Sequence, residues 1–536
     1  MTEKSAGRSF LQGALILSIA TALVKIIGAV FKIPLANLIG GSGMAHFNTA
    51  YTIYNVLLVI STAGLPVALS KMIAESRARG RTLEIKRIVG VARTAFMAVG
   101  LAGAAFMFFM AQPLADLMAN EKGSTAIMTL APAVFFVAMM SVYRGYFQGM
   151  SDMVPTAVSQ VIEALFKLAV GFSLAWLLKL WGFPMEICAA GGIGGVALGT
   201  GLGFVYIYLA SKFRGRPKKQ KNLEPGGESR SRKRLLKDLV VLAVPITLGA
   251  SVLSLVNFID TLLVMNRLQS PAGFSEEAAL NLYGSYTGLA QTMFNLPGAF
   301  IVTIAVSIIP AISAALARND HGGAARTIES AMRINMLLSM PAGFGLAALS
   351  YPILSLLFFS VPGEVAIASP LLTILGAAVI LNAVVLVSNA VLQAYGRVRL
   401  PVYSMAIGGA VKIAVNFVLV GDPAININGA PIGTVCCYGV IAVINIGFMI
   451  RYSEAKLRLS SVFLRPMIAA AVMAGAAWSV NAALSRVVSQ RISVLAAIAV
   501  GGILYLILAI LIRAVTKEDM RLLPKGEKLA KILRIK

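Results

Sequence analysis

The chain has 536 residues, of which 58% are hydrophobic and 13% are charged, and its mean hydropathy is +0.83. A soluble protein of this length does not have such a composition, so we expect a membrane protein. The net charge of +25 would fit nucleic-acid binding only in a soluble basic domain, and the sequence has none. Composition therefore excludes a nucleic acid as the partner.

Apolar runs long enough to cross a bilayer recur along the whole chain, because about 20 helical residues span a hydrocarbon core of about 30 Å. We recognise fourteen, at 10–38, 48–70, 89–111, 126–148, 154–178, 187–211, 239–265, 285–316, 334–358, 366–394, 401–420, 431–450, 463–483 and 493–514. The first run is too long and too charged for a cleavable signal peptide. The predicted fold class is an all-α polytopic membrane protein with 14 transmembrane helices.

The positions of the basic residues predict the orientation. Most of the 47 Lys and Arg residues fall in the N-terminus and in every second loop, including 71–93 and 212–237. Because positively charged loops stay inside, both termini are predicted to be cytoplasmic. The same basic segments predict attraction to anionic membrane lipids.

Enzymatic and metal chemistry find little support in the sequence. The longest outer loop, about 266–284, is too short for the catalytic loop of an outer-face glycosyltransferase, and no phosphate-cradling loop for ATP occurs. Cys436 and Cys437 are adjacent inside a span, and His46 and His321 are expected in loops. We therefore predict no enzyme activity, no metal site and no cofactor.

An internal repeat suggests a transporter. Gln148, Pro155 and Lys167 recur about 245 residues later, and the Gln-to-Lys separation from Gln393 to Lys412 is again 19 residues. Membrane proteins built from two such halves are usually transporters with a substrate site between the halves, near the bilayer midplane.

The repeat predicts two six-helix lobes in a parallel pseudo-twofold arrangement, plus two C-terminal helices. The predicted domains are an N-lobe at 1–211, a basic cytoplasmic linker at 212–238, a C-lobe at 239–452, helices 13 and 14 at 453–515, and a basic amphipathic cytoplasmic tail at 516–536.

Charges inside the spans are candidate functional residues, because a charge at the bilayer centre costs about 2.5–3.5 kcal/mol on insertion scales. Six qualify: Lys25, Lys32, Glu163, Lys167, Asp260 and Lys412. The helical rise places Lys167 and Lys412 near the midplane, whereas Lys32 is near enough to the outer face to snorkel. The excess of lysines predicts an anionic substrate such as a phosphate or diphosphate.

Two interpretations stay open for several of these residues. Glu163 and Lys167 are four residues apart and face one side of a helix, so they either neutralise each other or take part in ion or proton coupling. Asp260 fits a polar helix end as well as a site. Arg144, at a cytoplasmic helix end, fits an interfacial anchor or a gate.

The motifs RGYFQG, PTAVSQVIE, AGLPVALSK, NLPGAF and SIIPAIS resemble the SpoVB/YtgP group of Gram-positive polysaccharide exporters. That group belongs to the multidrug/oligosaccharidyl-lipid/polysaccharide (MOP) flippase superfamily and is related to MurJ-type lipid II flippases. The resemblance covers nearly the whole chain. It implies fourteen helices, two lobes around a central cavity, and movement of an undecaprenyl-diphosphate-linked cell-wall precursor across the bacterial cytoplasmic membrane.

The resemblance carries over to some site residues. Lys25 matches a basic cavity position of helix 1, Lys32 matches loosely, and Asp260 matches an acidic position of helix 7. Gram-negative MurJ proteins carry an Asp-Arg-x-x-Glu cluster in helix 8, whereas this chain has the uncharged Gln291 and Asn295 there.

The predicted function is a flippase that moves the precursor, with lipid II the favoured substrate, from the inner to the outer leaflet by alternating access. The predicted substrate-binding residues are Lys25, Lys32, Lys167, Lys412 and Arg144; the predicted ion-coupling or polar cavity residues are Glu163, Asp260, Gln291 and Asn295. The protein is expected to work as a monomer. Coupling to the membrane potential, Na⁺ or H⁺ stays open, as does a role in sporulation. The alternatives are a cation-coupled multidrug exporter and an exporter of another lipid-linked polysaccharide unit.

Overall fold

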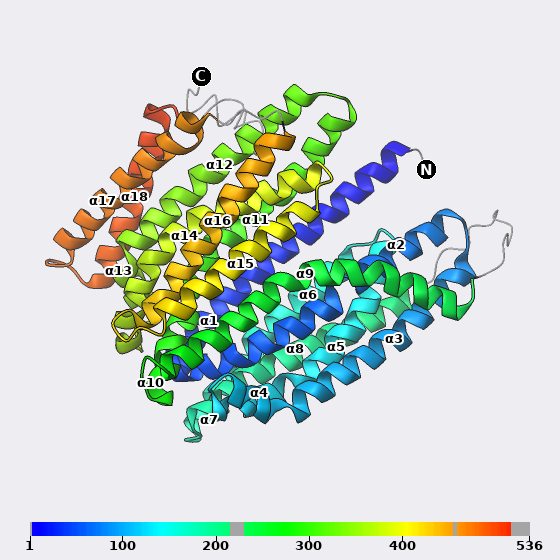
Figure 1. The fold of residues 1–536 in the computed structure, drawn as a ribbon, viewed down its shortest axis with the longest axis horizontal. Helices are drawn as coiled ribbons and strands as arrows, with labels where there is room; N and C mark the ends of the chain where they lie inside the picture. The colour runs from blue at the N-terminus through cyan, green and yellow to red at the C-terminus, as the bar shows by residue number, and fades with distance from the viewer. Residues whose placement is uncertain (1–2, 215–229, 454–457, 516–536) are drawn as a thin grey trace. The chain divides into compact units, whose positions relative to one another are not determined.

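The computed structural model describes residues 3–214, 230–453 and 458–515, which form helices with no strand among them (Figure 1). In this part of the chain, 11 helices are long and apolar enough to cross a membrane, or 12 if one bent pair is a single span. The chain is therefore a multi-pass membrane protein with an all-helical fold. The count of fourteen spans stays a prediction. The tail and most of the basic linker lie outside the described residues.

The chain divides into two compact units, Met1–Asn266 and Arg267–Lys536. The N-terminal unit contains α1 (Glu3–Thr62), α2 (Leu65–Ala78), α3 (Thr82–Phe109), α4 (Ala111–Leu117), α5 (Ser124–Gly149), α6 (Val154–Phe166), a π-helix (Lys167–Gly171), α7 (Phe172–Leu180), α8 (Met185–Arg214) and nearly all of α9 (Arg232–Gln269). The boundary thus falls near the end of α9, and the predicted lobe limits stay a prediction.

Within the N-terminal unit, α5 is the central helix. It packs against α3 on one side and α8 on another, and these helices lie side by side in Figure 1. The first helix, α1, packs against α5, α6 and α8. This arrangement brings the motif-bearing helices α5 and α6 together around α1.

A kink at Gly40 divides the 60-residue α1 into two helical stretches. Its φ of 67° lies in the left-handed region, which glycine adopts without the steric cost of a Cβ atom. Because the helix resumes at once, the expected loop position of His46 is wrong. His46 is buried in α1, and its Nδ1 lies 2.6 Å from Oδ1 of Asn120. His321, the first residue of α12, is also helical rather than in a loop.

Within the N-terminal unit, an ionic network joins the start of α9 to the start of α3. The carboxylate of Glu84, which is 1% exposed, accepts hydrogen bonds from Arg230 at 2.6 Å and from Arg81 at 3.4 Å. Arg230 also pairs with Asp238 at 3.0 Å. The hydrogen bond to Glu84 raises the pKa of Arg230, so this charge persists at any physiological pH.

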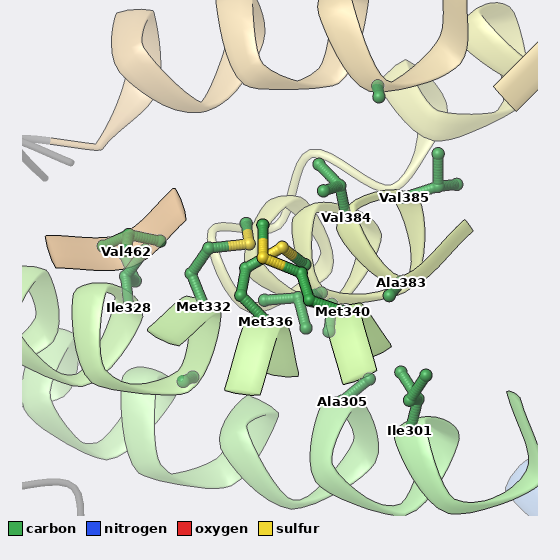
Figure 2. Packing of buried hydrophobic residues seen from close by; sticks show 14 of the residues in the cluster. Ile301, Ala305, Ile328, Met332, Met336, Met340, Ala383, Val384, Val385 and Val462 are labelled. Carbon is green, nitrogen blue, oxygen red and sulfur yellow. The ribbon is translucent and has the colours of Figure 1, made fainter. Parts of the chain in front are cut away.

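The C-terminal unit contains α10 (Glu276–Gly284), a π-helix (Ser285–Ala290), α11 (Gln291–Ala317), α12 (His321–Ala348), α13 (Ser350–Leu357), α14 (Pro362–Ala394), α15 (Arg399–Leu419), α16 (Gly429–Tyr452), a π-helix (Ser460–Leu464), α17 (Arg465–Leu484) and α18 (Gln490–Leu511). Its core is formed where α14 packs against α11, α12 and α16. Figure 2 shows Met332, Met336 and Met340 of α12 at the centre of this core. Flexible methionine side chains fill the irregular space between such helices.

The predicted span 334–358 is broken in the structure. It begins earlier, at His321, and α12 and α13 meet near Leu349 at an angle of 83°. Inside α12, Pro341 has no N–H, so the carbonyl of Leu337 loses its usual helical donor. The hydroxyl of Tyr505 on α18 donates to this carbonyl at 2.8 Å. The C-terminal helix therefore satisfies the acceptor that the proline leaves open.

Candidate functional site

The N-terminal unit contains a cavity of about 560 Å³. Helices α1, α2, α5, α6 and α8 and the first π-helix line it. Its charged lining residues are Lys25, Arg144, Glu163 and Lys167. Three cationic side chains against one carboxylate make the lining net positive.

Aromatic rings hold the ammonium group of Lys167. Its Nζ lies 4.7 Å from the ring centre of Tyr51 and 5.3 Å from that of Phe31, both on α1. Such cation–π contacts stabilise a positive charge without neutralising it. Lys167 also begins the first π-helix, and π-helical turns are frequent at functional sites.

Glu163 pairs with Arg144 rather than with Lys167. Its Oε2 accepts a hydrogen bond from Nη2 of Arg144 at 3.2 Å, and its Oε1 accepts one from Thr200 at 3.3 Å. Nε of Arg144 donates to the hydroxyl of Ser159 at 3.1 Å. The spacing of Glu163 and Lys167 predicted a mutual pair, but an arginine from α5 reaches the carboxylate instead. The interpretation as a mutually neutralising pair is therefore wrong for this structure.

Lys25 and Lys32, both on α1, have different surroundings. Lys25 lines the cavity and is exposed there. Lys32 does not line it, and its Nζ donates to Oδ1 of Asn48 at 3.0 Å, across the kink of α1. Of these two lysines, Lys25 is therefore the one that a molecule in the cavity can reach.

Glycines of α8 bring the helix that carries Glu163 and Lys167 close to α8. A Cβ at Gly199 would lie 2.7 Å from the carbonyl oxygen of Glu163 and 3.1 Å from the amide nitrogen of Lys167. A Cβ at Gly195 would lie 2.2 Å from Cα of Gly171. Only glycine permits this approach of the two backbones, as at other close helix contacts in membranes.

The remaining predicted site residues lie outside this cavity's lining. Lys412 is 7% exposed in α15, interacts with a neighbouring group and lies near Tyr438. Asp260 is 7% exposed in α9 and also has a partner. On α11, Gln291 is half-buried and Asn295 is exposed.

A second cavity, of about 480 Å³, lies in the C-terminal unit. Residues of α11, α12, α13, α17 and α18 line it, among them Pro297 and Pro341, and every side chain in its lining is apolar. Neither Gln291 nor Asn295 belongs to that lining. The two cavities thus differ sharply in chemistry.

Several polar lining residues are not among the predicted site residues. Gln148, Thr156, Gln160 and Tyr51 all line the charged cavity. Gln160 and Thr156 carried a usable signal, because each is an uncharged polar residue inside an apolar span. Tyr51 had no such signal, since an aromatic residue in a span usually packs against apolar neighbours.

Comparison with known proteins places the chain in a family. The model of the family described as "Polysaccharide biosynthesis protein" matches residues 10–316. The chain belongs to this polysaccharide biosynthesis family. A second model, MatE, matches residues 245–418. These matches confirm the resemblance to the SpoVB group and its superfamily.

Relatives of this family member match it over nearly its full length. Stage V sporulation protein B of Bacillus subtilis (strain 168) is 25% identical, and the match covers 97% of this chain and 98% of that protein. Lipid II flippase MurJ of the same organism is also 25% identical, over 92% of this chain and 94% of that protein. The chain is thus related to flippases and transporters rather than to catalytic enzymes.

A solved structure of lipid II flippase MurJ in an inward closed conformation matches with a TM-score of 0.69. The match covers 93% of this chain and 99% of that chain at 15% identity. At this identity the likeness shows a common fold. This member of the polysaccharide biosynthesis family therefore has a MurJ-like fold of the MOP superfamily.

Proposed function

We propose that this protein is a flippase for an undecaprenyl-diphosphate-linked cell-wall precursor, with lipid II as the favoured substrate. It moves the precursor from the inner to the outer leaflet of the bacterial cytoplasmic membrane by alternating access. The proposal rests on one observation above the others: the cavity of the N-terminal unit carries Lys25, Arg144 and Lys167 against a single carboxylate.

The chemistry of a diphosphate suits this lining. Phosphate oxygens accept charge-assisted hydrogen bonds, and arginine and lysine are the side chains that supply them. Lys167 supports the proposal because aromatic rings rather than an acid compensate its charge. The apolar cavity of the C-terminal unit is consistent with a substrate that carries a hydrocarbon chain.

The other parts of the proposal follow from the predicted site. Lys32 and Lys412 take supporting positions, and Asp260, Gln291 and Asn295 supply polar or ion-coupling groups. The protein works as a monomer in contact with anionic lipids. The membrane potential, Na⁺ or H⁺ supplies the driving force.

A cation-coupled multidrug exporter is the second candidate, because the MatE model matches residues 245–418. A cationic drug would favour a net acidic cavity, whereas the cavity of the N-terminal unit is net basic. Direct comparison of a fluorescent lipid II with ethidium in the same vesicles separates the two candidates. An exporter of another lipid-linked unit, or a sporulation role, would instead show in the undecaprenyl-linked intermediate that accumulates after depletion.

The test replaces Lys25 or Lys167 by Met in the full-length protein reconstituted in proteoliposomes. Each lysine lost removes a charge-assisted hydrogen bond of about 1.5–3 kcal/mol, so we expect lipid II transport to fall roughly 10- to 100-fold. Transport is measured by the rate at which fluorescent lipid II becomes accessible to an impermeant quencher.

Lys212→Met is the matched control. Lys212 also lies over an aromatic ring, that of Tyr208 at 4.8 Å, but it does not line the cavity. This variant should transport at the wild-type rate. Wild-type transport by both Lys25→Met and Lys167→Met would refute the assignment of the cavity as the diphosphate site.

A further inference from the structure

We propose that Glu163 is an internal counter-anion, which holds Arg144 in the empty cavity and releases it to a phosphate group of the substrate. The proposal rests on the proposed function, in which the cavity of the N-terminal unit receives a diphosphate. It assigns Glu163 to the control of substrate affinity and release.

The hydrogen bonds around Arg144 suit such an exchange. One nitrogen, Nη2, contacts a single carboxylate oxygen of Glu163 at 3.2 Å, and Nε contacts the hydroxyl of Ser159 at 3.1 Å. Nη1 of Arg144 has no hydrogen-bond partner among the described residues. The contact is therefore not the two-bond fork that arginine makes with a carboxylate or phosphate in its strongest pairs. A phosphate that reaches Arg144 can make the two parallel hydrogen bonds that Glu163 does not make.

The cavity gives both groups access to a ligand. The side chains of Arg144 and Glu163 are 15% and 25% exposed, and both line the cavity. Glu163 is the only acidic residue in that lining. Because Lys167 is held by aromatic rings, the competition between carboxylate and phosphate is concentrated on Arg144.

Thr200 offers the carboxylate of Glu163 a hydrogen-bond donor when Arg144 leaves. Its hydroxyl, on α8, lies 3.3 Å from Oε1 of Glu163 and 2.7 Å from the carbonyl oxygen of Val196, and it can turn its single hydrogen to either acceptor. Glu163 can therefore remain hydrogen-bonded during the exchange and take Arg144 back when the phosphate departs. A transporter needs such reversibility, since a site that binds too tightly does not release its substrate.

The predicted second copy of the repeat lacks this ion pair. The positions 245 residues after Arg144 and Glu163 are Asn389 and Gly408. There Asn389 accepts a hydrogen bond from Asn445 at 2.7 Å, and a Cβ at Gly408 would lie 2.3 Å from Ile441. A neutral amide thus stands where Arg144 would be, and a glycine packed against Ile441 stands where Glu163 would be. The charged pair is present only in the copy whose helices line a charged cavity.

The test measures the affinity of the full-length protein in detergent for inorganic pyrophosphate by isothermal titration calorimetry. Glu163→Gln removes the competing charge and keeps the side-chain shape, so pyrophosphate should bind about fivefold more tightly. Transport of lipid II in proteoliposomes should become slower, because release becomes harder. A merely structural role for Glu163 would lower both affinity and transport.

Glu186→Gln is the matched control. The side chain of Glu186 is 23% exposed, close to the 25% of Glu163, and it pairs with Lys122 outside the cavity. Glu186→Gln also removes one negative charge, and this variant should leave the affinity for pyrophosphate unchanged. Equal tightening by both variants would mean a general charge effect and would overturn the proposal.

The other outcomes separate this inference from the proposed function. If Glu163→Gln binds pyrophosphate no more tightly while Lys167→Met binds it more weakly, the counter-anion role is wrong and the anion site stands. If Lys25→Met and Lys167→Met leave pyrophosphate binding unchanged, the anion site itself is wrong.

Should Glu163→Gln fail to fold, Glu163→Asp keeps the charge but shortens its reach. That variant should bind more tightly than wild type, and equal or weaker binding would overturn the proposal.

Discussion

The ammonium group of Lys167 lies over the rings of Tyr51 and Phe31. An aromatic face attracts a cation but leaves its net charge in place. The nearest acid along the same helix, Glu163, is held by Arg144 and Thr200. Lys167 can therefore present a full positive charge to a ligand in the cavity.

Replacing Tyr51 by Leu tests the contribution of the ring. A cation–π contact contributes about 0.5–2 kcal/mol, so loss of the ring should weaken pyrophosphate binding about 2- to 30-fold. Tyr51→Phe keeps the ring and should bind as the wild type does. Calorimetry on the purified full-length variants measures both. Equal weakening in the two variants would assign the effect to the hydroxyl group instead.

Charged residues inside apolar spans are the part of the site that the sequence could predict. Lys25 and Lys167 were found because charges in apolar spans are rare, and the structure brings both to one cavity. The partner of Glu163 was not predicted, since four-residue spacing describes one helix only and the competing Arg144 comes from another. Gln160 lines the same cavity but was not predicted, because an uncharged polar residue in an apolar span is a weaker signal than a charge.

Close packing of α8 against α6 and the π-helix positions the site. The small residues of α8, in the segment AAGGIGGVALGTGLG, let the backbones of these helices approach. The carbonyl oxygen of Glu163 and the amide of Lys167 are both near Gly199. The geometry of two charged side chains thus depends on a residue that has no side chain.

Gly199→Ala should move α6 away from α8, since its Cβ would lie 2.7 Å from a backbone oxygen that cannot rotate aside. Overpacking of this kind costs about 1–3 kcal/mol, and we expect a lower melting temperature and a roughly tenfold loss of transport. At Gly201→Ala, on the same helix, the nearest atom to the new Cβ would be in the ring of Phe136, at 3.5 Å, which is an ordinary contact, and the variant should behave as the wild type. Unchanged transport and stability in Gly199→Ala would show that the contact does not position the site.

Apolar runs predicted most helices, because the length of a span is determined by the thickness of the bilayer. The kink at Gly40 falls in the gap between the predicted spans 10–38 and 48–70. The bend of 83° between α12 and α13 was not predicted, because it lies inside the apolar run 334–358 and hydropathy carries no information on backbone direction. The sequence also did not predict the hydrogen bond from Tyr505 to the carbonyl of Leu337, because the two residues are 168 positions apart in the chain.

At the scale of the whole molecule, the number of crossings between two positions determines whether they share a side of the membrane. Between residues 80 and 225 the structure contains four helices that can cross a membrane: Thr82–Phe109, Glu121–Gly149, Val154–Leu180 and Met185–Phe213. Between 225 and 275 it contains one, Arg232–Gln269. An even number returns the chain to the same side, and an odd number does not.

We therefore predict that residues 80 and 225 and the C-terminus face the cytoplasm and that residue 275 faces outward. The crossing numbers support the relation among 80, 225 and 275, and the basic loops support the assignment of the inside. Single cysteines at these positions, in a variant that lacks Cys188, Cys436 and Cys437, are treated with a membrane-impermeant thiol reagent in intact cells. Only residue 275 should react before the cells are permeabilised. Labelling of residue 225 in intact cells, with residue 80 unlabelled, would require an odd number of crossings between them and would overturn this topology.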